Sequence, residues 1–186
     1  MQETPLVQTF SALTQHDRRE LEKFVNSPAF NQREDVRRLF QYLRENVPVA
    51  GNTGDVKSHL TKTSAYEQVF TASEGRRSAG YDDALMRHAM SFLYKLIKRY
   101  LAYTAWAENE LAVGIHLCQA LRSRGLDKIY LKEFKALEAQ FDSSAKQSAD
   151  YFFQQYQLRL EYWEVFQRTE RGGKTNLKEV GDAFGA

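Results

Sequence analysis

Cysteine is almost absent from this sequence. Cys118 is the only one among 186 residues, so neither an intramolecular disulfide nor a four-cysteine metal site can form. A chain without disulfides fits a reducing compartment, although a secreted protein without disulfides remains an alternative. The N-terminal residues MQETPLVQTF contain no basic stretch followed by an apolar one, as a signal peptide would. We therefore expect a cytoplasmic protein.

Long apolar runs and a net charge of one sign are also missing. No stretch approaches the roughly 20 apolar residues that cross a bilayer, which argues against a membrane protein. The 26 basic and 24 acidic residues leave a net charge of only +2. A general attraction to nucleic acid or to anionic lipid is therefore weak, and any basic surface must be local.

Proline occurs only at positions 5, 28 and 48, and alternating strand-like runs are scarce. From Val49 onward no proline interrupts a helix. Hydrophobic residues make up 42% of the chain, which is enough to bury a core. These features predict an all-α protein of one domain, or of one domain with a small N-terminal piece.

Capping signals and helical spacing predict about seven helices. Gly125 is expected to end one of them as a C′ glycine. Capping boxes are predicted at Thr14 with Asp17, at Asn31 with Glu34 and at Ser64 with Glu67. The expected helices cover residues 14–26, 31–47, 64–70, 82–107 and 109–124, a stretch that begins at 127, and residues 148–169.

The pattern of helices and turn-rich stretches divides the chain into four predicted segments. An N-terminal helical hairpin covers residues 1–48, and a linker with one short helix covers 49–81. The main helical bundle covers 82–171, and residues 172–186 form a tail or the start of a further helix. Because the helix-like stretch LKEVGDAF begins just before the sequence stops, we expect the natural chain to continue past Ala186.

The stretch YFFQQYQLRLEYWEVF (151–166) is apolar on two faces of its predicted helix. A helix of this kind needs neighbours on both sides, so its back is expected to meet a protein partner, further helices of a longer chain, or a second copy. The alternative is that these rings only fill the core. The candidate residues for partner binding or self-association are Tyr151, Tyr156, Tyr162, Trp163 and Phe166.

Consecutive antiparallel hairpins with short turns indicate a layered, solenoid-like array similar to tetratricopeptide repeats, although the 34-residue consensus is not met. The segments LTQHDRRELEKFVNSPAFNQREDVRRLFQYL, YDDALMRHAMSFLYKLIKRYLAY, LRSRGLDKIYLKEFKALEAQ and ADYFFQQYQLRLEYWEVF resemble an uncharacterised family of larger bacterial all-helical proteins. The resemblance covers residues 13 to about 184. It implies that this chain is the N-terminal part of a helical-repeat protein, and it implies no activity.

No residue pattern typical of catalysis stands out. RGGKT (171–175) resembles the end of a phosphate-binding loop, but Arg168 stands where that loop needs glycine. The four histidines lack metal-binding spacing, and the carboxylates lie beside lysine and arginine on polar helix faces. We therefore expect no enzyme, no metal and no cofactor. The favoured hypothesis is a non-catalytic protein-interaction or scaffold module.

A basic stripe on the predicted helix 82–107 gives a second hypothesis, nucleic-acid binding together with the N-terminal hairpin. The alternative is an ordinary solvated face. Glu34 and Asp35 disfavour a helix-turn-helix reading of residues 15–46, because acids in the first turn of the second helix would meet phosphates. Nucleic acid is accordingly the disfavoured partner. The candidate residues for a polyanion are Arg76, Arg77, Arg87, Lys95, Lys98 and Arg99.

Overall fold

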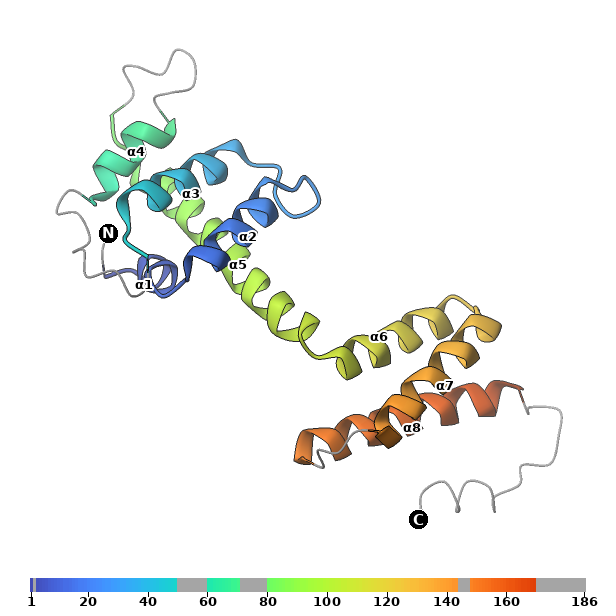
Figure 1. Ribbon diagram of the computed structural model, residues 1–186. Helices are drawn as coiled ribbons and strands as arrows, with labels where there is room; N and C mark the ends of the chain where they lie inside the picture. Colours follow the sequence, from blue (N-terminus) through green and yellow to red (C-terminus); the bar gives the residue numbers. More distant parts are fainter. Residues whose placement is uncertain (2, 50–59, 71–79, 144–147, 170–186) are drawn as a thin grey trace. The chain divides into compact units, whose positions relative to one another are not determined.

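The computed structural model describes residues 1, 3–49, 60–70, 80–143 and 148–169, with the backbone alone for 142–143 and 166–169. The described residues form eight α-helices and no strand, which confirms the all-α prediction (Figure 1). The helices are α1 (Pro5–Ser11), α2 (Gln15–Asn26), α3 (Glu34–Asn46), α4 (Lys62–Phe70), α5 (Asp83–Ala107), α6 (Glu110–Ser123), α7 (Asp127–Ser143) and α8 (Ala149–Thr169).

The expected number of about seven helices is corrected to eight, because the sequence reading missed α1. Pro5 occupies its first turn, where proline has no hydrogen bond to lose and its fixed φ suits the helix. Leu6, Val7 and Phe10 then form a short apolar stripe that is buried. The helix forms because this stripe packs into a core, not because seven residues are stable alone.

The chain divides into two compact units, Met1–Tyr103 and Thr104–Ala186, and the boundary falls inside α5. Each unit has its own cluster of buried apolar side chains. The four segments expected from the sequence remain a prediction, since the division into units follows contacts only. The tail at 172–186 and most of the linker lie outside the described residues.

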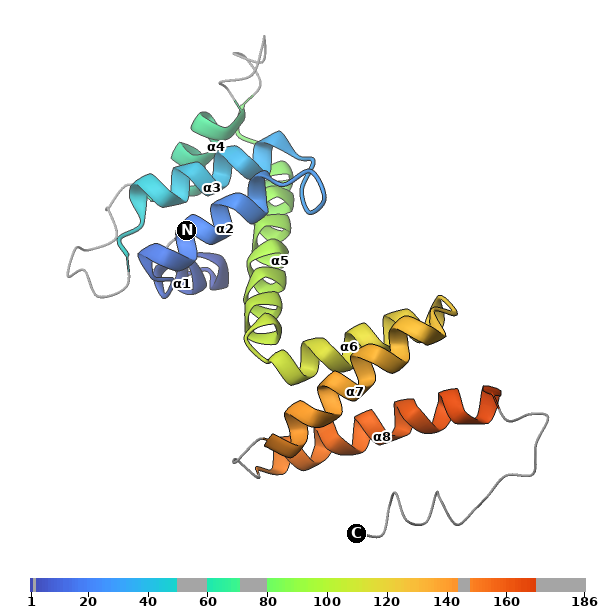
Figure 2. The ribbon, with the colours of Figure 1, turned by 45° about the vertical axis from the view of Figure 1, so that its right-hand side comes forward.

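The first unit is built on the amphipathic faces of α1 to α5. Thr14 caps α2 through the predicted capping box, because its Oγ1 accepts from the Asp17 amide and Asp17 accepts in return from the Thr14 amide. Figures 1 and 2 show α2 beside α3 and α4 beside α3, with α5 behind them in the view of Figure 1. Phe10 and Phe40 meet edge to face at 5.8 Å in the shared core.

Arg18 joins three parts of this unit from a position that is only 2% exposed. Its guanidinium donates to the carbonyl oxygens of Val47 at 2.7 Å, Phe10 at 3.1 Å and Pro48 at 2.5 Å. The same group lies 4.4 Å from the centre of the Phe10 ring. These carbonyls stand at the C-terminal ends of α1 and α3, where the helix dipole favours a cation.

Two predicted capping boxes are wrong. Asn31 is buried and does not cap α3; its side chain donates to the Val25 and Arg33 carbonyls and accepts from the Arg33 amide. It therefore joins the end of α2 to the start of α3. Its side chain supplies hydrogen bonds to backbone groups of the turn that would otherwise bind water. At α4 the residue that accepts from the Ser64 amide is Thr61, so the helix begins one turn earlier than predicted.

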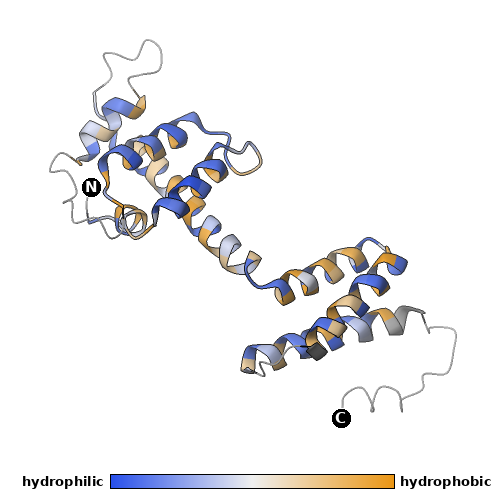
Figure 3. Cartoon of the chain, in the orientation of Figure 1, coloured by the Kyte–Doolittle hydropathy of each residue, from blue (hydrophilic) through white to orange (hydrophobic). Residues whose placement is uncertain are grey.

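In the second unit, α6 packs against α7 and against α8. Gly125 ends α6 with φ of 67°, as predicted, and the Gly125 and Leu126 amides donate to the Arg122 and Leu121 carbonyls. At Gly114 a Cβ atom would stand 2.6 Å from Leu137 Cδ1, so α6 and α7 approach closely there. Figure 3 shows apolar residues along much of α6.

Candidate functional site

One face of α8 is fixed against the rest of the second unit. Leu158 and Val165 are buried in its core, and Tyr151 is partly buried against Phe141. The Tyr151 hydroxyl also donates to the Phe141 carbonyl at 3.1 Å. Since these residues recur at seven-residue intervals, they lie on a single side of the helix and set its rotation.

A buried ion pair fixes the same face. Glu161 is 8% exposed and accepts from Arg122 Nε at 2.7 Å and from Gln119 Nε2 at 3.1 Å. Burial alone would lower the pKa of Arg122, but the hydrogen bond and the charge of Glu161 outweigh burial and raise it. A buried charge is tolerated only with its partner, so this pair favours one register of α8 on α6.

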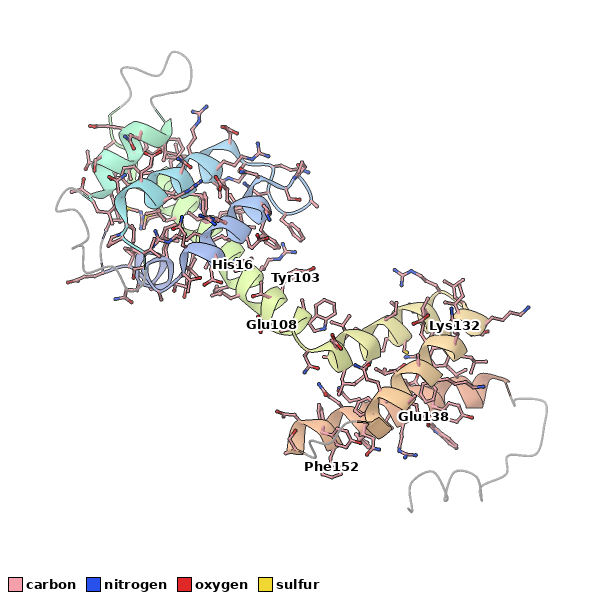
Figure 4. All side chains as sticks on the ribbon, viewed as in Figure 1. His16, Tyr103, Glu108, Lys132, Glu138 and Phe152 are labelled. Carbon is pink, nitrogen blue, oxygen red and sulfur yellow. The ribbon has the colours of Figure 1, made fainter. Side chains whose placement is uncertain are left out.

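The opposite side of α8 carries large apolar side chains without a core around them. At about 100° per residue, these side chains fall in the sector that faces away from Leu158. Figure 4 shows Phe152 on the side of α8 away from α6. The α8 outer face consists of Phe152 (53% exposed), Phe153 (60%), Tyr156 (51%) and Leu160 (38%).

The five candidates of the aromatic helix do not share one face. Tyr156 belongs to the α8 outer face, and Tyr162 is 43% exposed with its ring 5.2 Å from that of Phe134. Trp163 and Tyr151 are partly buried. Phe166 lies in α8, but its side chain is outside the described residues. Phe152, Phe153 and Leu160 were missed as candidates. Their helical spacing from the apolar Leu158 puts them on the opposite side of the helix, which the sequence could have indicated.

The basic stripe of α5 divides in a similar way. Arg87 forms an ion pair with Asp83 at 2.9 Å. Arg76 and Arg77 lie outside the described residues. Lys95, Lys98 and Arg99 are exposed and form no ion pair with any residue that the structure describes. We call these three residues the α5 basic turn.

Aromatic rings stand beside the α5 basic turn. Phe30, in the turn between α2 and α3, stacks on Phe24 with the ring centres 3.9 Å apart. The Arg99 guanidinium lies 5.7 Å from the centre of the Phe30 ring. Tyr103 is 52% exposed and its ring centre is 6.4 Å from that of Phe24. The fold therefore brings the α2–α3 turn next to Arg99 of α5, within one unit.

Cys118 is placed as a packing residue. It is fully buried on α6, and burial raises the pKa of its thiol to about 11. A thiol with this pKa is protonated at neutral pH and is a poor nucleophile or metal ligand. Nearby, burial also raises the pKa of Tyr130, whose hydroxyl has no hydrogen-bond partner among the residues that the structure describes.

The chain matches no protein-family model, and comparisons with curated proteins and with solved structures found no match. None of the described helices is both long and apolar enough to cross a membrane. In the same part of the chain, no group of three or more His, Cys, Asp or Glu side chains is placed to hold a metal ion. A functional proposal therefore depends on the α8 outer face and the α5 basic turn.

Proposed function

We propose that this protein is a non-catalytic interaction module whose α8 outer face binds an apolar face of another helix. The observation that carries the proposal is the exposure of Phe152, Phe153, Tyr156 and Leu160 on one side of a helix. A contiguous exposed apolar patch is uncommon on monomeric proteins and often marks an interaction site. Aromatic side chains are also the residue type that contributes most at interfaces between proteins.

The spacing of the exposed residues favours a helix as the ligand. Phe153, Tyr156, Leu160 and the partly buried Trp163 follow one another at intervals of three, four and three positions. This is the spacing with which helices pack side by side along a shared seam. The Arg122–Glu161 pair supports the proposal, because it holds α8 in the rotation that leaves this seam outward.

The wider setting of the proposal comes from the sequence. Antiparallel hairpins such as α6 and α7 are the units from which helical-repeat scaffolds are built. We place the chain in a cytoplasmic, tetratricopeptide-like scaffold of the bacterial kind that it resembles. The bound helix then belongs to a protein partner or to a further part of a longer chain.

Self-association gives a test that needs no known partner, because two copies of an apolar seam can pair with each other. We expect the wild-type chain to associate reversibly as its concentration rises, measured by light scattering on a size-exclusion column. The F153E/L160E variant is expected to remain monomeric, since burying each unpaired carboxylate costs about 2 kcal/mol or more.

A matched control makes the same chemical change on α7. Ile129 and Leu131 are 49% and 42% exposed, so I129E/L131E adds the same charge at similarly exposed positions outside the seam. It should leave association unchanged. A wild-type chain that stays monomeric at every concentration and binds no hydrophobic dye would contradict the proposal. Equal effects of the two double variants would do so as well.

A further inference from the structure

The α5 basic turn differs from the other cationic surface of the first unit. Every arginine of α3 and its N-terminal cap has an acidic partner: Arg33 pairs with Asp35, Arg37 and Arg38 with Glu34, and Arg44 with Glu22. Lys95, Lys98 and Arg99 have no such partner among the described residues. Moreover, no acid occurs in the sequence between Asp83 and Glu108.

Helix electrostatics do not account for this turn. Positions 95, 98 and 99 are neighbours at intervals of three and four residues, where like charges destabilise a helix. Cations are favoured in the last turn of a helix, but α5 continues to Ala107, two turns beyond Arg99. Three adjacent cations without a carboxylate partner among the described residues therefore carry a cost in the free chain that a bound polyanion would remove.

The rings beside the turn indicate which polyanion fits. The Phe30 ring lies next to Arg99 and is already stacked on Phe24, while Tyr103 follows Arg99 by four positions on α5 and approaches Phe24. We propose that the α5 basic turn and these two rings form a binding site for single-stranded nucleic acid. Lys95, Lys98 and Arg99 contact phosphates, while Tyr103 and Phe30 offer surfaces on which unpaired bases stack.

A single strand fits this site better than a duplex does. Bases of a duplex are stacked on each other and leave no face for Tyr103, whereas a single strand can turn its bases outward. The helix that would have to enter a groove, α3, begins with Glu34 and Asp35 and has its arginines already paired. An acidic peptide or an anionic membrane would use the cations but has no need of the rings.

Fluorescence anisotropy with a labelled thymidine oligonucleotide tests the site on the full chain. Three phosphate contacts predict that the logarithm of the affinity falls with that of the salt concentration with a slope of about −2. The K95Q/K98Q/R99Q variant should lose about tenfold or more in affinity at low salt, and its slope should approach zero. The matched control K128Q/K132Q/K135Q makes the same charge change on α7, where Figure 4 labels Lys132, and should bind as the wild type does.

The ring contribution is tested by Y103A, which should weaken oligonucleotide binding by about fivefold or more and leave the weak binding of polyglutamate unchanged. Thermal melting establishes that each variant is folded. No binding at low salt overturns the proposal, as does an equal loss in the α7 control. Tighter binding of duplex DNA, of anionic vesicles or of polyglutamate overturns it as well. The F153E/L160E variant should bind the oligonucleotide normally, so failure of this site is separate from failure of the α8 outer face.

Discussion

Arg18 is the residue on which the first unit depends most clearly. It is almost fully buried and holds three carbonyls from two helix ends, while no carboxylate pairs with it among the described residues. Burial lowers its pKa from the ordinary value. Its charge is therefore stabilised by oriented backbone dipoles, which only a correctly folded unit provides.

Replacing Arg18 by alanine should lower the free energy of unfolding by about 3 kcal/mol, because the guanidinium bonds to the Val47, Phe10 and Pro48 carbonyls are lost from a largely buried site. Urea denaturation followed by circular dichroism measures this loss. The neighbouring R19A is the control, since Arg19 is exposed and its removal should change stability by less than about 0.5 kcal/mol. Equal stabilities of R18A and R19A would show that the guanidinium bonds contribute little.

Cys118 makes a prediction about alkaline pH. Burial raises the pKa of its thiol to about 11 in the folded protein, above the ordinary value of 9.0 that applies in an unfolded chain. Below the pKa of the unfolded chain, the thiol is protonated in both the folded and the unfolded state, and its ionisation does not reduce the free energy of unfolding. As the pH rises from there toward 11, the unfolded chain ionises first, so stability falls by up to about 1.4 kcal/mol per pH unit.

Ultraviolet absorbance follows this titration as the difference between the wild type and C118A, because the ten tyrosines also ionise and absorb at alkaline pH. We expect this difference signal near pH 11 in buffer and near the ordinary thiol pKa in concentrated urea. Ionisation near the ordinary value in buffer would place the thiol in water and contradict its burial.

At the scale of elements, the turn between α6 and α7 is the clearest test. Gly125 has φ of 67°. The amides of Gly125 and Leu126 donate hydrogen bonds to carbonyls in the last turn of α6. G125A should lower stability by about 1 kcal/mol, because a Cβ atom is strained in this conformation. G80A is the control, since Gly80 has no positive φ and no atom within 4 Å of an added Cβ. Melting temperatures compare the two, and an unchanged G125A would contradict the assigned turn.

Helix positions were largely predictable from local sequence, because spacing and capping act within a few residues. Thr14 with Asp17 and Gly125 were read correctly for that reason. Asn31 was not, because its pattern fits a cap, whereas its side chain is buried and donates to the Val25 carbonyl of the preceding helix. The helix α1 was missed since its seven residues fold only against a core that the sequence pattern does not display.

The candidate surfaces were less predictable, because they depend on which face each helix turns inward. The sequence of α8 has apolar residues on several sides of the helix. The side that faces inward is set in part by the contact of Glu161 with Arg122, which is 39 positions away in the sequence. On α5 the basic stripe was visible, but the pairing of Arg87 and the approach of Phe30 to Arg99 required tertiary structure. Sequence reasoning therefore pointed to α5 and α8, and it named only some of the residues that the structure places on each candidate surface.

At the scale of the whole molecule, each unit combines a core of its own with one candidate surface. The first unit carries the α5 basic turn, and the second carries the α8 outer face. Buried polar groups join helices within each unit: Arg18 joins α2 to the ends of α1 and α3, and the Arg122–Glu161 pair joins α6 to α8. This arrangement is consistent with the proposed interaction module and proves no function by itself.

The central claim is that the α8 outer face is open in the free chain and becomes covered on association. Thiol labelling of an L160C variant measures this directly, with the buried Cys118 as an unreactive internal reference and I129C as the control on α7. The L160C thiol should react rapidly in dilute solution. Its rate should fall by about tenfold or more when the chain is concentrated enough to associate, while the rate of I129C stays the same under both conditions. Slow labelling of L160C at every concentration, or labelling that stays fast while the chain associates, would contradict the account.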